Sequence, residues 1–127
     1  ADMVPKTKID AEIDLDEISM DFVRNLNILE PLGQGNSQPI FMSSGLFMLC
    51  SPRIVGRNHL KMWFQNKDRV VEAIGFGMCD RLKQLDKTEK PFDIAYVPKI
   101  NSYYGTDTVQ LVIKDIRPSS AISKYNA

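Results

Sequence analysis

The chain has 127 residues, about a quarter of them charged and 43% hydrophobic, which is the composition of a globular protein with room for one ordinary domain. No apolar run approaches the ~20 residues that span a bilayer, and the first residues lack a basic segment followed by an apolar one, so we expect a cytoplasmic protein. Cys50 and Cys79 have no motif spacing, which favours two reduced, buried thiols over a disulfide.

The net charge of zero conceals an uneven distribution of charge along the chain. Residues 1–40 hold eight acids and three bases, a net charge of −5, so residues 41–127 carry +5. Two windows, 31–67 and 94–106, have no acidic residue. They hold the cations Arg53, Arg57, Lys61, Lys67 and Lys99, the lone His59, and the tyrosines Tyr96, Tyr103 and Tyr104. Charge alone leaves a polyanionic partner and an ordinary solvated surface equally open.

The N-terminal segment combines a strand pattern with a helix pattern. Residues 8–13 alternate apolar and polar side chains, as in a strand with one wet face. Asp14 and Glu17 have the spacing of a capping box, and apolar residues at helical spacing predict a helix of about fourteen residues that Pro31 ends. One strand and one helix cannot bury a core alone. Residues 1–30 are therefore expected to be the end of a neighbouring domain, or an appendage docked on the remainder of the chain.

A glycine- and proline-rich stretch, EPLGQGNSQPIF, spans residues 30–41. Gly33-Gln34-Gly35 matches the first three positions of a dinucleotide-binding loop. Such a loop follows a strand and opens a helix, whereas this one follows a helix pattern and precedes a strand pattern. It also needs a third glycine, and Gln38 occupies that position here. Residues 31–39 are therefore interpreted as a joint.

The rest of the chain predicts a mainly β domain over residues 40–119, followed by a frayed polar tail at 120–127. Strands are expected at 40–50, 54–65, 69–76, 92–100 and 108–116, with a short helix at 78–85 and a loop at 101–106. Glu72 shares a strand face with Val70 and Ile74, which suggests a bulge near Gly75. Five strands with a helix between the third and fourth predict an OB-fold barrel. An SH3-like barrel and a fragment of a sandwich remain open.

An OB barrel binds ligands on the face of its second and third strands, between two loops. Cations that track phosphates and flat side chains that stack on bases are what binding of single-stranded DNA requires. The candidate DNA-binding residues are Arg53, Arg57, His59, Lys61, Trp63, Lys99, Tyr103 and Tyr104. Structural roles remain open for them: Trp63 packed under the N-terminal helix, the tyrosines as hairpin residues, His59 as a surface or strand residue. One histidine and two distant cysteines cannot form a usual zinc site, so no catalytic or metal-binding residue is predicted.

Several stretches together resemble the C-terminal part of the RecJ family of single-strand-specific exonucleases: LNILEPLGQGNSQPIF, RIVGRNHLKMWF, VEAIGFGMCDRL and VQLVIKDIRPS. The resemblance implies a protein that degrades single-stranded DNA from the 5′ end in recombination and repair. In that family a DHH domain holds Mn²⁺ or Mg²⁺, and a DHHA1 domain and an OB-type domain come after it.

This sequence has no Asp-His-His motif, so no catalytic or metal-binding residue of the family can be assigned to it. The resemblance implies a fragment that is inactive alone: the last strand and helix of DHHA1 (1–30), the joint and the OB domain. Its expected partners are single-stranded DNA and the rest of a RecJ-like polypeptide. The alternative is a protein-interaction barrel that braces the nuclease core or docks a repair partner.

Overall fold

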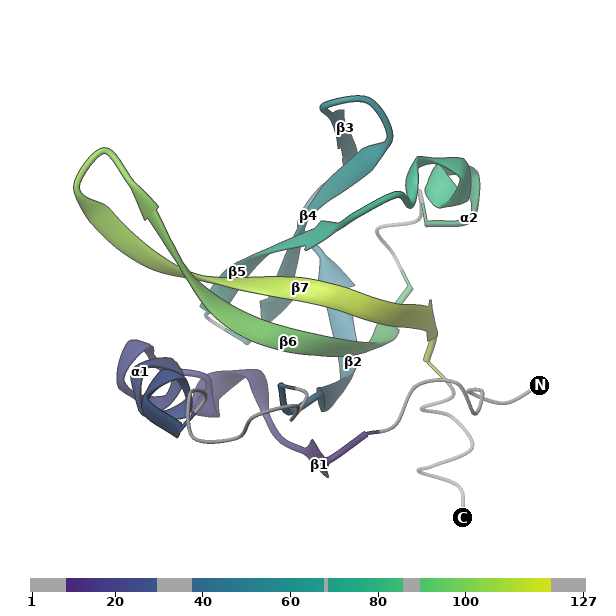
Figure 1. Ribbon diagram of the computed structural model, residues 1–127. Helices are drawn as coiled ribbons and strands as arrows, with labels where there is room; N and C mark the ends of the chain where they lie inside the picture. Colours follow the sequence, from purple (N-terminus) through teal and green to yellow (C-terminus); the bar gives the residue numbers. More distant parts are fainter. Residues whose placement is uncertain (1–8, 30–37, 68, 86–89, 120–127) are drawn as a thin grey trace, which may run out of the picture.

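A computed structural model describes residues 9–29, 38–67, 69–85 and 90–119 (Figure 1). Its elements, in chain order, are β1 (Ala11–Glu12), the 3-10 turn η1 (Leu15–Glu17), α1 (Met20–Leu29), β2 (Phe41–Met48), β3 (Arg53–Val55), β4 (His59–Asn66), β5 (Arg69–Gly75), the 3-10 turn η3 (Cys79–Arg81), α2 (Leu82–Leu85), β6 (Phe92–Tyr103) and β7 (Thr106–Pro118). Within these ranges no helix is long and apolar enough to cross a membrane.

Five strands close into a ring. Strand β2 pairs with β6 on one side and β4 on the other, and the ring continues through β5 and β7 back to β6. All of these pairings are antiparallel except that of β5 with β7, which is parallel. This order, with α2 between the third and fourth strands of the ring, is that of an OB-fold barrel, and it confirms the predicted fold class.

The bend that closes the barrel lies in β2. The register of β2 against β6 shifts between Ser43 and Leu46, and Gly45 takes a positive φ of 68° there. A bulge of this kind twists a strand sharply, which lets the two ends of β2 reach different neighbours. The Asp93 carboxylate on β6 accepts the Gly45 backbone N–H at 3.0 Å and supports the bulge.

The core lies inside the ring and is built from buried side chains of its five strands, β2, β4, β5, β6 and β7. Along β4 the inward side chains are Leu60, Met62 and Phe64, and all three are fully buried. β5 adds Val71 and Ala73, β6 adds Ile94 and Tyr96, and β7 adds Leu111, Ile113 and Ile116. Leu85 of α2 is buried in the same cluster, as the helical pattern predicts.

The N-terminal segment is docked on the barrel and extends its core. Strand β1 pairs in parallel with the start of β2, and the Asp10 carboxylate accepts the Ile40 N–H at 2.8 Å. Leu15 and Ile18 are fully buried in the core cluster, and Phe22 of α1 meets Phe41 edge to face with ring centroids 5.5 Å apart. In Figure 1, α1 accordingly lies against β6. Of the joint predicted at 31–39, residues 31–37 lie outside the described ranges.

Polar contacts fasten this segment at two places. The Arg69 guanidinium of β5 donates to the carbonyls of Leu15 and Ile18, each at 2.5 Å. The Ser43 hydroxyl contacts the Ile13 carbonyl and the Tyr96 hydroxyl, each at 2.7 Å. Burial raises the pKa of the Tyr96 phenol from 10.0 to about 12, although the hydrogen bond with Ser43 lowers it in part. The assignment of residues 1–30 to a separate DHHA1-type domain stays a prediction.

Several predicted boundaries were wrong. The strand expected at 54–65 is a hairpin of β3 and β4, because Gly56 adopts a φ of 62° and turns the chain. The loop expected at 101–106 is mostly strand, since β6 and β7 continue to a two-residue turn. The N-terminal helix divides into η1 and α1, and the short helix at 78–85 into η3 and α2.

The bulge expected near Gly75 was also wrong. The β4–β5 register runs without a break from Leu60 opposite Gly75 to Asn66 opposite Arg69. Of the two cysteines, both free, Cys50 is exposed and Cys79 half-buried, so the expectation of two buried thiols was wrong. The predicted tail at 120–127 lies outside the described residues.

Candidate nucleic-acid interface

The outward face of the barrel aligns side chains from four neighbouring strands. Register places Trp63 of β4 beside Glu72 of β5, Glu72 beside Gln110 of β7, and Gln110 beside Lys99 of β6. The next row joins Lys61 to Ile74 and Val112 in the same way. Because register partners point to the same side of a sheet, these residues form one continuous surface.

Glu72 lies at the centre of this surface and holds two of its neighbours. One carboxylate oxygen accepts a hydrogen bond from the Gln110 side-chain amide at 2.6 Å, and the other pairs with the Lys61 ammonium at 3.7 Å. The Lys61 and Glu72 side chains are 33% and 26% exposed, so the pair is partly screened by solvent. It fixes the position of Lys61 while partly neutralising its charge.

Two cations contact the ring of Trp63. The Arg53 guanidinium, on β3, is 5.6 Å from the centroid of the Trp63 ring, and the Lys61 ammonium is 5.8 Å from it. Both distances are within the range of a cation–π contact. The β3–β4 hairpin causes this arrangement, because it pairs Arg53 directly with Lys61.

The β6–β7 hairpin stands beside this surface and ends in two tyrosines. Tyr103 is 63% exposed and Tyr104 is 96% exposed, with their rings edge to face and the centroids 4.9 Å apart. Tyr104 and Gly105 form the turn with positive φ values of 50° and 79°, as in the tight turns that match strand twist. A non-glycine residue in this conformation is strained, yet the Tyr104 side chain gains almost no burial in return.

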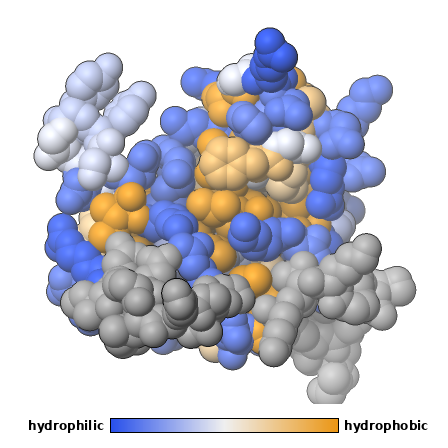
Figure 2. Space-filling model, viewed as in Figure 1, coloured by the Kyte–Doolittle hydropathy of each residue, from blue (hydrophilic) through white to orange (hydrophobic). Residues whose placement is uncertain are grey.

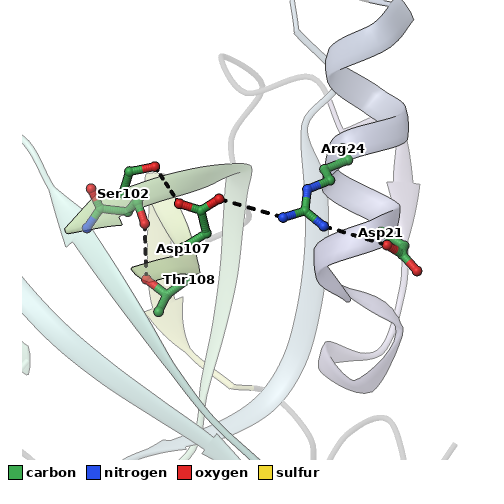
Figure 3. Close-up of polar contacts among 6 residues, drawn as sticks. Asp21, Arg24, Ser102, Asp107 and Thr108 are labelled. Atoms are coloured by element: carbon green, nitrogen blue, oxygen red, sulfur yellow. Dashed lines mark hydrogen bonds and ion pairs between the residues drawn. The ribbon is translucent and has the colours of Figure 1, made fainter. Parts of the chain in front are cut away.

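A short chain of polar contacts ties the hairpin to the N-terminal helix (Figure 3). The Asp107 carboxylate accepts a hydrogen bond from the Ser102 hydroxyl at 2.6 Å and pairs with the Arg24 guanidinium of α1 at 3.6 Å. Arg24 also lies 3.9 Å from Asp21 on its own helix. The hairpin is thus braced from the side of α1.

Two clefts run along the surface on either side of Glu72. The first, of about 490 Å³, opens between the β3–β4 and β6–β7 hairpins and is lined by Val55, Lys61, Glu72, Ile74, Asn101, Tyr103, Thr106, Thr108 and Gln110. The second, of about 430 Å³, extends toward α1 and is lined by Met20, Trp63, Arg69, Val70, Val71, Glu72, Thr108 and Val109. Glu72 and Thr108 line both clefts, which therefore meet there.

The structure brings together some of the predicted binding residues but not all of them. Arg53, Lys61 and Trp63 form the cationic cluster, and Tyr103 lines the first cleft. Lys99 ends the row of side chains on β6, Arg57 is exposed at the turn between β3 and β4, and Tyr104 is at the hairpin tip.

His59 makes contacts within the fold. Its Nδ1 accepts the Gly77 backbone N–H at 2.9 Å, and its ring meets Phe76 edge to face. This contact supports the alternative that the sequence left open for His59. Whether any of the eight predicted residues contacts DNA stays a prediction.

Sequence reasoning missed Glu72 and Gln110. Val70, Glu72 and Ile74 alternate in the sequence as one strand face, but an acid between two apolar residues suggests a bulge there and not an outward face. Within the described ranges, no group of three His, Cys, Asp or Glu side chains could hold a metal ion.

Comparison with known proteins gives consistent matches. Residues 9–115 match the family model of the RecJ OB domain. The single-stranded-DNA-specific exonuclease RecJ of Haemophilus influenzae is 30% identical over 113 residues, which cover 86% of this chain and 19% of that protein. RecJ of Bacillus subtilis is 24% identical over 126 residues, which cover 98% of this chain and 15% of that protein. The chain thus spans less than a fifth of the length of these relatives.

The fold itself is more widely shared. A crystal structure from Leishmania major described as an aspartyl-tRNA synthetase superposes with a TM-score of 0.60 at 15% identity, and the match covers 93% of this chain and 23% of that one. At this identity the likeness concerns the fold alone.

Proposed function

Because this chain belongs to the RecJ OB-domain family, we propose that it binds single-stranded DNA along the two clefts that meet at Glu72. The observation that carries the proposal is the cluster of Arg53, Lys61 and Trp63, beside a cleft that Tyr103 also lines. In this proposal the bound strand is delivered to the DHH domain of a RecJ-type 5′–3′ exonuclease. That domain, with its Mn²⁺ or Mg²⁺, lies outside these residues, from which we expect no nuclease activity alone.

The chemistry of the cleft suits an unpaired strand better than a duplex. Stacking of a base on an aromatic side chain contributes roughly 1–3 kcal/mol and is available only where bases are unpaired. Tyr103 offers an exposed ring for this contact, whereas Trp63 is half-buried and already in contact with Arg53. A base at Trp63 therefore stacks on the Arg53 guanidinium plane or takes its place over the ring. Either arrangement leaves a cation beside the adjoining phosphate.

Titration of the chain with oligo-dT tests the proposal directly. Trp63 is the only tryptophan, so its fluorescence reports on the centre of the proposed site. We expect binding at low salt that weakens as salt rises, because cations that neutralise phosphates release counterions. Undetectable binding at low salt, or an affinity that does not change with salt concentration, would exclude the proposal.

Two variants separate the stacking contribution from the ionic one. Tyr103→Ala and Lys61→Ala should both weaken binding of oligo-dT, but only Lys61→Ala should flatten the dependence on salt. Lys83→Ala on α2 is the matched control, since Lys83 is exposed and lines neither cleft. If Lys83→Ala weakens binding as much as Lys61→Ala does, the effect is one of net charge and not of this site.

A second candidate function is a barrel that braces the nuclease core or docks a repair partner. Exposed apolar side chains favour it: Phe76 is 58% exposed and Leu49 is 51% exposed, and Figure 2 shows apolar side chains gathered at the centre of one face. However, Leu49 donates its backbone N–H to the Trp63 carbonyl, so it adjoins the cationic cluster instead of forming a separate surface. A chain that fails to bind oligo-dT at low salt would favour this second function.

A further inference from the structure

Glu72 has an unusual position for an acid in a site that is to bind a polyanion. Glu72 is the one acidic residue among those that line the two clefts, and it lines both of them. Its carboxylate is held by Gln110 at 2.6 Å and by Lys61 at 3.7 Å, so it is fixed where the clefts meet. A bound strand has to pass this carboxylate.

The charge of Glu72 decides which part of the strand can face it. Phosphates are repelled by a carboxylate, and the half-buried position of Glu72 weakens the screening that water provides. The exposed cation Arg53 lies on the β3 side of the site, where it can take the phosphates. The base edges are then left to face Glu72 and Gln110.

The groups at this point distinguish between bases. Gln110 directs its amide N–H toward Glu72, and the carboxylate itself can only accept hydrogen bonds. Cytosine offers an exocyclic amino group, the donor that Glu and Asp recognise in base readout. Thymine offers a single imide N–H, which lies between two carbonyl oxygens. The carboxylate repels these oxygens.

We propose that Glu72, oriented by Gln110, reads the base edge of the bound strand and favours cytosine over thymine. This inference rests on the proposed function of the same clefts. It adds to that function a preference among bases and an orientation for the strand, with its bases turned toward β5 and β7 and its phosphates toward β3.

Competition between oligo-dC and oligo-dT of equal length, at low salt and pH 7.5, tests the inference. We expect the wild-type chain to bind oligo-dC about tenfold more tightly, the lower range for a specific contact to a base edge. Glu72→Gln removes the charge and keeps the shape, so it should bring this ratio close to one while oligo-dT binds at least as well as before. Asp16→Asn, on η1 and outside both clefts, makes the same change in net charge and should leave the ratio unchanged.

The possible outcomes are distinct. If the wild-type chain binds the two oligonucleotides with equal affinity, the proposed base contact is wrong, and no variant is needed to show it. A preference for oligo-dC that persists in Glu72→Gln also overturns it. Failure of both oligonucleotides to bind at low salt overturns the proposed function itself.

Discussion

Arg69 offers the sharpest test of how the N-terminal segment is attached to the barrel. Its guanidinium donates to two carbonyls, those of Leu15 and Ile18, at the point where the segment enters the core. Arg69→Met keeps most of the aliphatic stem and removes both hydrogen bonds. A hydrogen bond to a charged group contributes about 1.5–3 kcal/mol, and partial exposure places these two at the lower end. The substitution should therefore lower the free energy of unfolding by about 3 kcal/mol.

Equilibrium unfolding in urea, monitored by Trp63 fluorescence and by far-ultraviolet circular dichroism, measures this loss. Arg81→Met is the matched control, because the Arg81 guanidinium donates to a single carbonyl, that of Ile116, at 2.8 Å. It should cost about half as much. A value for Arg69→Met within about 0.5 kcal/mol of wild type would refute the view that these two hydrogen bonds hold the segment in place.

Three further predictions concern the core and the hairpin. Because burial raises the pKa of Tyr96 to about 12, its contribution to stability is complete below pH 10 and is lost as pH rises from 10 to 12. Tyr96→Phe should abolish that loss, which amounts to about 2–3 kcal/mol, in urea titrations at a series of pH values. Tyr104→Asn should stabilise the chain by about 0.5–1 kcal/mol, because Asn tolerates positive φ, while weakening oligo-dT binding; loss of stability would contradict the strain argument. Asp107→Asn breaks an exposed ion pair with Arg24 and should change the unfolding free energy by less than about 0.5 kcal/mol.

Local pattern was sufficient for the barrel because buried and half-buried residues alternate cleanly along β4. The inward residues Leu60, Met62 and Phe64 of β4 repeat every second position, and the helix before β6 occupies the place that the OB order requires. The hairpin boundaries were harder to predict. Gly56 and Gly105 each turn the chain in left-handed conformations, but neither comes after Asn or Asp, the usual partner in a two-residue hairpin turn.

The candidate site was only half predictable for a different reason. The cations and aromatic residues near β4 are close in sequence, so a barrel model was enough to group Lys61 with Trp63. Glu72 and Gln110 are 38 positions apart and meet only because β5 and β7 pair in parallel. If each strand is expected to have one polar and one apolar face, Glu72 looks irregular, because it shares its face with Val70 and Ile74. The register between distant strands is what makes it the centre of a surface.

Side-chain contacts connect the N-terminal segment to the clefts. Arg69 holds the Leu15 and Ile18 carbonyls and also lines the second cleft, as does Met20 at the start of α1. The Arg24–Asp107 pair connects α1 to the hairpin that carries Tyr103. A shift of α1 against the barrel would therefore alter both clefts at once, through Arg69 at one end and the hairpin at the other. The N-terminal segment is thus part of the surface proposed to bind DNA.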